Sequence, residues 1–162
     1  RPAVGGPPAA ARHLGDRRLA LQGIAGAMLS ALAPRPASAV AADAIDQPAA
    51  PGPSAFAARA LALQRLAIER GDQPYGAVVV KGDRIVGLGV SAVVNSGDPT
   101  AHAEMQAIRD AARRLGTRDL AGCELYGSAR ACPMCEAAAY WARIDRLRHG
   151  DDATDDGPPR LR

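Results

Sequence analysis

Two short motifs carry the side chains best suited to chemistry in this chain of 162 residues. The first is His-Ala-Glu at residues 102–104, and the second is Cys-Pro-Met-Cys at residues 132–135. One imidazole and two thiolates are ligands that zinc prefers, and three protein ligands leave its fourth tetrahedral position open to water. The motifs therefore predict a catalytic Zn²⁺ site formed by His102, Cys132 and Cys135.

Glu104 lies two residues after the predicted ligand His102, near the metal without being a ligand. Bound zinc lowers the pKa of its water from about 16 to about 7, which provides zinc-bound hydroxide at neutral pH. We expect this hydroxide to attack an amidine carbon while Glu104 carries the proton to the ring nitrogen and then to the departing amino group. The chemistry predicted is hydrolytic deamination, with Glu104 as the proton shuttle.

Both motifs fall at predicted helix starts. Thr100 is a good N-cap for a helix with His102 in its first turn, and Pro133 suits the first turn of another helix, after Cys132 at the N-cap. A helix N-terminus favours thiolate, the form of cysteine that binds metal. Strands alternating with helices indicate an α/β fold with a mixed or parallel sheet flanked by helices. The predicted elements are helices over 55–70 (capped by Ser54), 101–115 and 131–143, and strands over 75–81, 84–91, 123–128 and 145–149.

The order of these motifs resembles the cytidine deaminase-like superfamily, whose signature is H-x-E followed by P-C-x-x-C. The likeness covers most of residues 55–150, and the segments 74–81, 98–104 and 140–145 look like those of bacterial guanine deaminases and related nucleoside deaminases. The resemblance implies a three-layer α/β/α sandwich with a mixed sheet, and deamination of a free nucleobase or nucleoside. It also implies a homodimer.

Three positions depart from the pattern of the superfamily. Arg130 and Ala131 stand where its members usually have Glu-Pro, and Ser91 stands where relatives commonly place a substrate-binding Asn. We expect Ser91 and Ala103 to contact the substrate, although a serine cannot reproduce the two-sided recognition of an amide. The departures leave open a non-catalytic, zinc-binding module of the same fold. They also leave open which base or nucleoside is deaminated.

The cysteines allow other interpretations. Cys132 and Cys135 in an exported protein would also suit a disulfide or redox pair. That interpretation leaves the His-x-Glu motif unexplained, and no fourth protein ligand is evident for a structural zinc site. Cys123 is interpreted as a buried core thiol.

The charge of the chain argues against a nucleic-acid substrate. Residues 1–39 hold five arginines and one acidic residue, so the other 15 basic and 16 acidic side chains give residues 40–162 a net charge of −1. A tRNA adenosine deaminase, the runner-up with the same chemistry, must hold a polyanion. We therefore expect a small-molecule partner and regard nucleic acid as unlikely.

The N-terminal segment has the pattern of an export signal. Arg17-Arg18 precedes an uncharged apolar stretch that ends at Leu32, and Ala-Ser-Ala at residues 37–39 suits cleavage. The apolar stretch is shorter than the ~20 residues that span a bilayer. We therefore predict a signal peptide over 1–39 of the twin-arginine type, with export to the periplasm or beyond; without such a signal the protein would stay in the cytoplasm. The remaining predicted divisions are a flexible linker over 40–53, a zinc deaminase domain over 54–150 and a short acidic tail over 151–162.

Overall fold

The computed structural model describes residues 44–161, so the predicted signal peptide lies outside the described residues. In this part of the chain no helix combines the length and apolar character needed to cross a membrane. The elements in chain order are α1 (Pro53–Glu69), β1 (Gly76–Lys81), β2 (Arg84–Val90), α2 (Val93–Ser96), α3 (Ala103–Leu115), β3 (Cys123–Gly127), α4 (Pro133–Trp141), β4 (Arg146–His149) and β5 (Thr154–Gly157).

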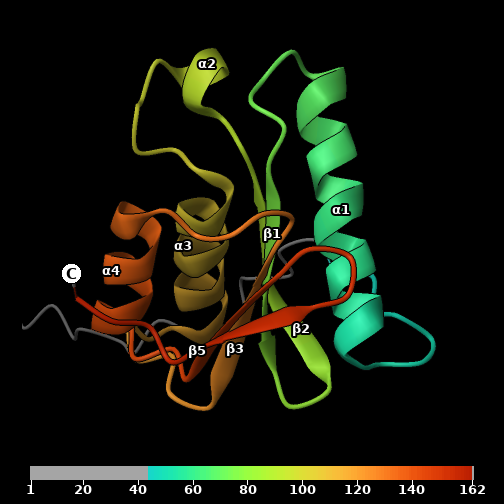
Figure 1. The fold of residues 1–162 in the computed structure, drawn as a ribbon, viewed down its shortest axis with the longest axis vertical. Helices are drawn as coiled ribbons and strands as arrows, with labels where there is room; N and C mark the ends of the chain where they lie inside the picture. The colour runs from blue at the N-terminus through green and yellow to red at the C-terminus, as the bar shows by residue number, and fades with distance from the viewer. Residues whose placement is uncertain (1–43, 162) are drawn as a thin grey trace, which may run out of the picture. The chain divides into compact units, whose positions relative to one another are not determined.

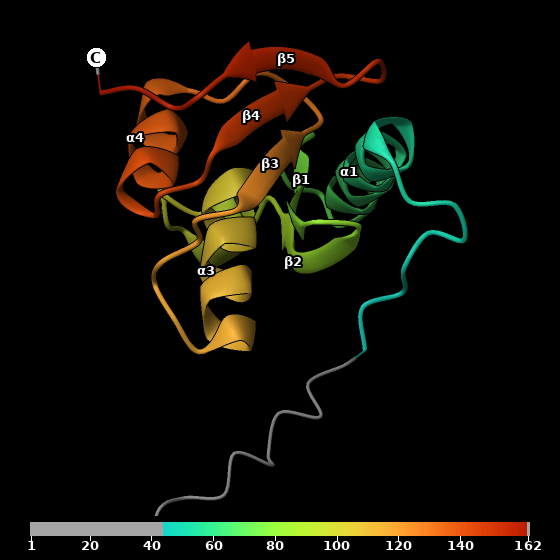
Figure 2. The same cartoon turned by 90° about the horizontal axis from the view of Figure 1, so that it is seen from below.

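The five strands form one mixed sheet in the order β2-β1-β3-β4-β5. β1 pairs antiparallel with both β2 and β3, β3 pairs parallel with β4, and β4 pairs antiparallel with β5. Helix α1 covers one face of the sheet, and α3 and α4 cover the other (Figures 1 and 2). The predicted α/β class and three-layer arrangement with a mixed sheet are confirmed.

The core lies on both faces of the central strand β1, whose side chains alternate between the two helical layers. Val78 and Val80 pack in the cluster beneath α1, with Phe56 and Tyr126. Val79 packs in the other cluster, beneath α3 and α4. Burial on both faces explains the continuous apolar run of β1, which is typical of a central strand.

Two glycines of β2 allow α3 to lie close against the sheet. A Cβ atom at Gly89 would lie 1.9 Å from the carbonyl oxygen of Ala103, and one at Gly87 would lie 2.5 Å from that of Ala107. Any larger residue would push α3 away from β2. Because α3 starts beside His102, these glycines set the position of the first predicted ligand.

The predicted caps need correction. The N-cap of α3 is His102 rather than Thr100, because Thr100 lies in a turn in which its N–H and hydroxyl both bond to Asp98 Oδ1 at 2.7 Å. The N-cap of α1 is Gly52 rather than Ser54, since the helix already begins at Pro53, a favoured first residue. Cys132 is the N-cap of α4, as the sequence predicts.

Two segments are more ordered than the sequence suggests. In the described part of the predicted linker, Ile45 packs on the cluster under α1, and the Gln47 side chain bonds to the N–H and carbonyl of Ile85 at 2.8 and 2.9 Å. The predicted acidic tail contains β5, which extends the sheet beyond β4. Its strand character escapes prediction because Asp-rich sequences disfavour strands in isolation, and here the carboxylates have basic partners.

Candidate metal centre

Three potential metal ligands meet where α3 and α4 begin. His102 and Cys132 are the N-caps of these helices, and Cys135 lies in the first turn of α4. His102 Nδ1 lies 3.6 Å from Cys132 Sγ and 3.7 Å from Cys135 Sγ, and the two sulfurs are 3.5 Å apart. The three side chains that the sequence predicts as ligands therefore converge on one point.

The spacing of these atoms fits a tetrahedral zinc ion. Zinc with Zn–S bonds of about 2.3 Å and Zn–N bonds of about 2.0–2.1 Å places two ligand sulfurs about 3.8 Å apart, and a sulfur and a nitrogen about 3.6 Å apart. The observed separations lie within 0.3 Å of these values. The cysteines are free thiols, so the structure does not contain the disulfide that was the other interpretation. Three ligands of this chemistry bind Zn²⁺ and leave one coordination position open.

Glu104 lies next to this group, in the first turn of α3. Its side chain is buried, and its Oε2 accepts a hydrogen bond of 3.6 Å from the Cys135 thiol. Burial raises the pKa of Glu104, because removal from water disfavours the charged carboxylate; a backbone hydrogen bond, the Cys135 thiol and His102 act in the opposite direction. A carboxyl group whose pKa lies above its usual value accepts a proton more readily and can still donate it, as a proton shuttle requires.

The Cys135 thiol is fully buried, and its pKa is raised by burial first and by the Glu104 carboxylate next. In the absence of a cation the thiol therefore keeps its proton. A metal ion at this position displaces that proton, because only thiolate is a good ligand.

A cavity of about 470 Å³ opens onto the metal group. His102, Glu104 and Cys132 are among the residues that line it. The segment that leads into β1 and the loop before α4 complete it, through Gln73, Pro74, Tyr75, Ala129 and Arg130. These five were not predicted as site residues. Ala129 and Arg130 could have been predicted to line the site, because they lie just before Cys132 in the sequence. Nothing in the sequence places residues 73–75 at the metal.

The two residues expected to contact substrate are both buried. Ser91 is 3% exposed, and its hydroxyl donates to Asp72 Oδ1 at 2.8 Å, so its polar group is already satisfied within the fold. Neither Ser91 nor Ala103 lines the cavity at the metal group. Ala103 is fully buried, and its carbonyl oxygen faces Gly89, where a Cβ atom would lie 1.9 Å from it. A substrate contact at either position stays a prediction.

The fold and the site define a class: an α/β protein with a three-ligand zinc group at two helix starts and a carboxyl group beside it. Residues 53–150 match the family described as the cytidine and deoxycytidylate deaminase zinc-binding region, which is more than half of the chain. The chain belongs to this deaminase family.

Individual relatives point to more than one substrate. The chain is 48% identical over 82 residues to guanine deaminase of Bacillus subtilis, covering 51% of this chain and 53% of that protein. It is 43% identical over 96 residues to tRNA-specific adenosine deaminase of Aquifex aeolicus, covering 59% and 64%. The crystal structure of the Bacillus subtilis guanine deaminase superposes with a TM-score of 0.57 and 44% identity, covering 59% of this chain and 61% of the other. The chain thus spans less than two thirds of the length of these curated relatives.

Proposed function

We propose that the protein catalyses the hydrolytic deamination of a free nucleobase or nucleoside, with a guanine-like base as the first candidate. The single observation that carries the proposal is that His102, Cys132 and Cys135 form one potential metal group, with His102, Cys132 and Glu104 lining the same cavity. The similarity to guanine deaminase supports this class of substrate.

In this mechanism the three ligands would hold Zn²⁺, which would supply activated water at neutral pH. Glu104 would take up one proton at a carboxylate oxygen as the water adds to the ring carbon, and would donate that proton to the ring nitrogen. Glu104 would then take a second proton from the hydroxyl group now on that carbon and give it to the amino group, which leaves as ammonia while the carbonyl forms. The buried position of Glu104 favours this role, because a raised pKa brings the carboxyl group closer to the operating pH.

The lining of the cavity offers surface for a planar ring. Pro74 and Tyr75 line the same cavity as His102. Tyr75 is partly exposed, so its ring is available to a planar ligand. A base lying against this surface would direct its amino-bearing carbon toward the metal group.

A second candidate substrate is adenosine in tRNA. The similarity to tRNA-specific adenosine deaminases supports a tRNA substrate as strongly as the similarity to guanine deaminase supports a free base. Arg130 also places a cation at the cavity. The net charge of −1 over residues 40–162 favours the small-molecule substrate, because it provides no broad basic surface for a polyanion.

The test is ammonia release from guanine, cytosine, adenine, their nucleosides and tRNA, using zinc-loaded protein. We expect release from at least one free base or nucleoside. Release from tRNA alone would favour the second candidate, and no release from any substrate would favour a non-catalytic zinc-binding module.

The Glu104→Gln variant tests the mechanism. It should lose about 100-fold or more of its activity, as removal of a general acid–base does, and still bind zinc. Glu124→Gln is the matched control, since Glu124 bonds to Tyr126 and Arg148 away from the cavity. Full activity in the Glu104 variant would exclude the proposed role.

Two further proposals accompany this function. We propose that residues 1–39 direct export, which a reporter fused to this segment would test by its appearance outside the cytoplasm. We also propose a homodimer, which sedimentation at working concentration would test. Retention of the reporter, or a monomer, would contradict the respective proposal.

A further inference from the structure

The last strand and the residues that follow it contact both sides of the Cys-x-x-Cys motif. In the C-terminal segment (residues 154–160), Asp156 Oδ1 lies 3.3 Å from the Nε of Arg130, two residues before Cys132. The N–H of Arg160 donates to Glu136 Oε1 at 3.2 Å, one residue after Cys135. The segments that flank both sulfur ligands are therefore attached to the C-terminal segment.

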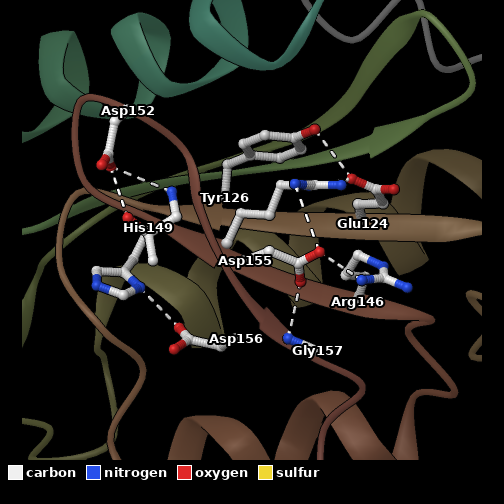
Figure 3. A network of polar contacts seen from close by, with 10 residues as sticks. Glu124, Tyr126, Arg146, His149, Asp152, Asp155, Asp156 and Gly157 are labelled. Atoms are coloured by element: carbon white, nitrogen blue, oxygen red, sulfur yellow. Dashed lines mark hydrogen bonds and ion pairs between the residues drawn. The ribbon is translucent and has the colours of Figure 1, made fainter.

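Asp156 is the centre of this arrangement. Its second oxygen, Oδ2, lies 2.7 Å from His149 Nδ1 at the end of β4 (Figure 3). One carboxylate thus joins β4, β5 and the loop that carries Arg130. The Asp156 side chain is 14% exposed and that of Arg130 is 62% exposed, so the carboxylate is held within the fold while the guanidinium reaches it from solvent, an arrangement that contributes up to about 1 kcal/mol.

The loop over 128–131 has no regular structure between β3 and α4. It carries Cys132 at its end, and Ala129 and Arg130 line the cavity. Ala131, which precedes the ligand, leaves its own φ free, whereas a proline there would fix it near −65°. The position of Cys132 therefore depends on contacts that this loop makes with other parts of the fold, and the Arg130–Asp156 pair is such a contact.

We propose that Asp156 and Arg130 are positioning residues of the metal centre, through which β5 holds the loop that presents Cys132. Arg130 lines the cavity at the metal group and also a small one of about 90 Å³, which Asp156, Glu136 and Arg160 line with it. The contact accordingly fixes one wall of the substrate cavity as well. The inference rests on the metal centre and is independent of which base is deaminated.

The experiment measures the zinc dissociation constant of the full chain by competition with a chromophoric chelator. Asp156→Asn and Arg130→Ala should each weaken zinc binding by about fivefold, the size of effect that such an ion pair supports. The double variant should be no weaker than either single variant, because both remove the same contact.

Asp155→Asn is the matched control. Asp155 is the neighbouring carboxylate on β5, and it pairs with Arg146 and Arg148. Neighbouring residues of a strand point to opposite faces, and Figure 3 shows the Asp155 and Asp156 side chains turned to different partners. This variant loses at least as many contacts but should keep zinc affinity within about twofold of the wild type.

A charge exchange keeps the test decisive if single variants lose stability. The R130D/D156R variant should recover zinc affinity relative to Arg130→Ala, because it restores an opposite-charge pair across the same two elements. Unchanged affinity in Asp156→Asn and Arg130→Ala, or losses equal to that of Asp155→Asn, would overturn the proposal. Absence of deamination by the zinc-loaded wild type would overturn the proposed function instead, since the affinity comparison does not use turnover.

Discussion

The two edges of the sheet are stabilised in different ways. At the β1–β2 edge, apolar side chains and two glycines pack directly against α1 and α3. At the β4–β5 edge, polar contacts join the strands. Arg148 forms an ion pair with Asp155, and Figure 3 shows Arg146 beside Asp155 and His149 beside Asp156. Packing of this kind depends on shape, whereas ion pairs depend on pH and ionic strength.

The metal centre combines ligands from both regions. His102 and Glu104 belong to α3, which lies against the glycines of β2. Cys132 and Cys135 belong to the start of α4, whose flanking residues contact the C-terminal segment. Changes in either region should therefore reach the zinc site, but by different routes and with different dependence on solution conditions.

The largest effect is expected where the two regions meet, at the ligands themselves. Cys135→Ser removes a metal ligand. Loss of a residue that only hydrogen-bonds to a ligand lowers metal affinity by about 10- to 100-fold, and we expect Cys135→Ser to lower zinc affinity by more than that. Cys123→Ser is the control, because Cys123 is equally buried but lies outside the metal group. Zinc stoichiometry and affinity measure the result, and similar losses in the two variants would contradict the assignment of ligands.

The next effect tests the packed edge. Gly89→Ala places a methyl group against the Ala103 carbonyl and should lower the free energy of unfolding by about 3 kcal/mol. It should also weaken zinc binding, because α3 must move with His102. Gly52→Ser is the control, since Gly52 has extended backbone and open space around it. Denaturant unfolding measures the effect, and wild-type stability in the Gly89 variant would show that α3 does not pack as described.

A smaller effect tests the charged edge. Arg148 bonds to Glu124 at 2.8 Å and lies over the Tyr126 ring, 5.8 Å from its centroid. Arg148→Ala should lower the free energy of unfolding by about 1 kcal/mol. At an ionic strength of about 1 M, where the Debye length is about 3 Å, part of that difference should disappear. A difference as large as that of Gly89→Ala, and insensitive to salt, would contradict the distinction between the two edges.

The smallest effect concerns an ionised group in the packed region. Burial pushes the pKa of Asp72 upward, but hydrogen bonds from Asn95, Ser91 and Gln73 outweigh it and hold the pKa below its usual value. A lowered pKa stabilises the fold above about pH 4, the value of the unfolded chain, and this contribution is lost as the pH falls through the folded pKa.

The Asp72→Asn variant makes that contribution measurable. It should melt below the wild type at pH 7, and the difference should shrink as the pH approaches 3. Thermal melts at several pH values check it. If the difference in melting temperature between the wild type and the variant grew as the pH fell, the pKa of Asp72 would be raised rather than lowered.

The sequence predicts the fold best where the pattern is local and apolar. The strand runs and the helices over 55–70 and 101–115 follow from periodicity and lie within a few residues of the observed elements. Strand β5 could not be predicted, because its Asp-rich sequence is stable as a strand only when Arg146, Arg148, Arg130 and His149 surround it. Those partners belong to other elements, so the periodicity of residues 154–157 alone cannot predict them.

The candidate site divides in the same way. His102, Glu104, Cys132 and Cys135 could be found because zinc ligands and a proton shuttle need particular residue types at close spacing. The cavity wall from Gln73 to Tyr75 could not, because the antiparallel pairing of β1 with β3 brings the start of β1 beside the loop that follows β3. Ser91 was predicted to contact substrate because it stands where relatives commonly place a substrate-binding Asn. In the structure its hydroxyl donates to Asp72 instead.

The central claim is that α3 and α4 together hold one zinc ion with an open position. X-ray absorption at the zinc edge of the loaded protein tests it most directly. We predict one zinc per chain, with two sulfurs at about 2.3 Å and two lighter atoms at about 2.0–2.1 Å, from His102 and water. A chain that binds no zinc, or a zinc ion with four sulfurs or none, would contradict the account.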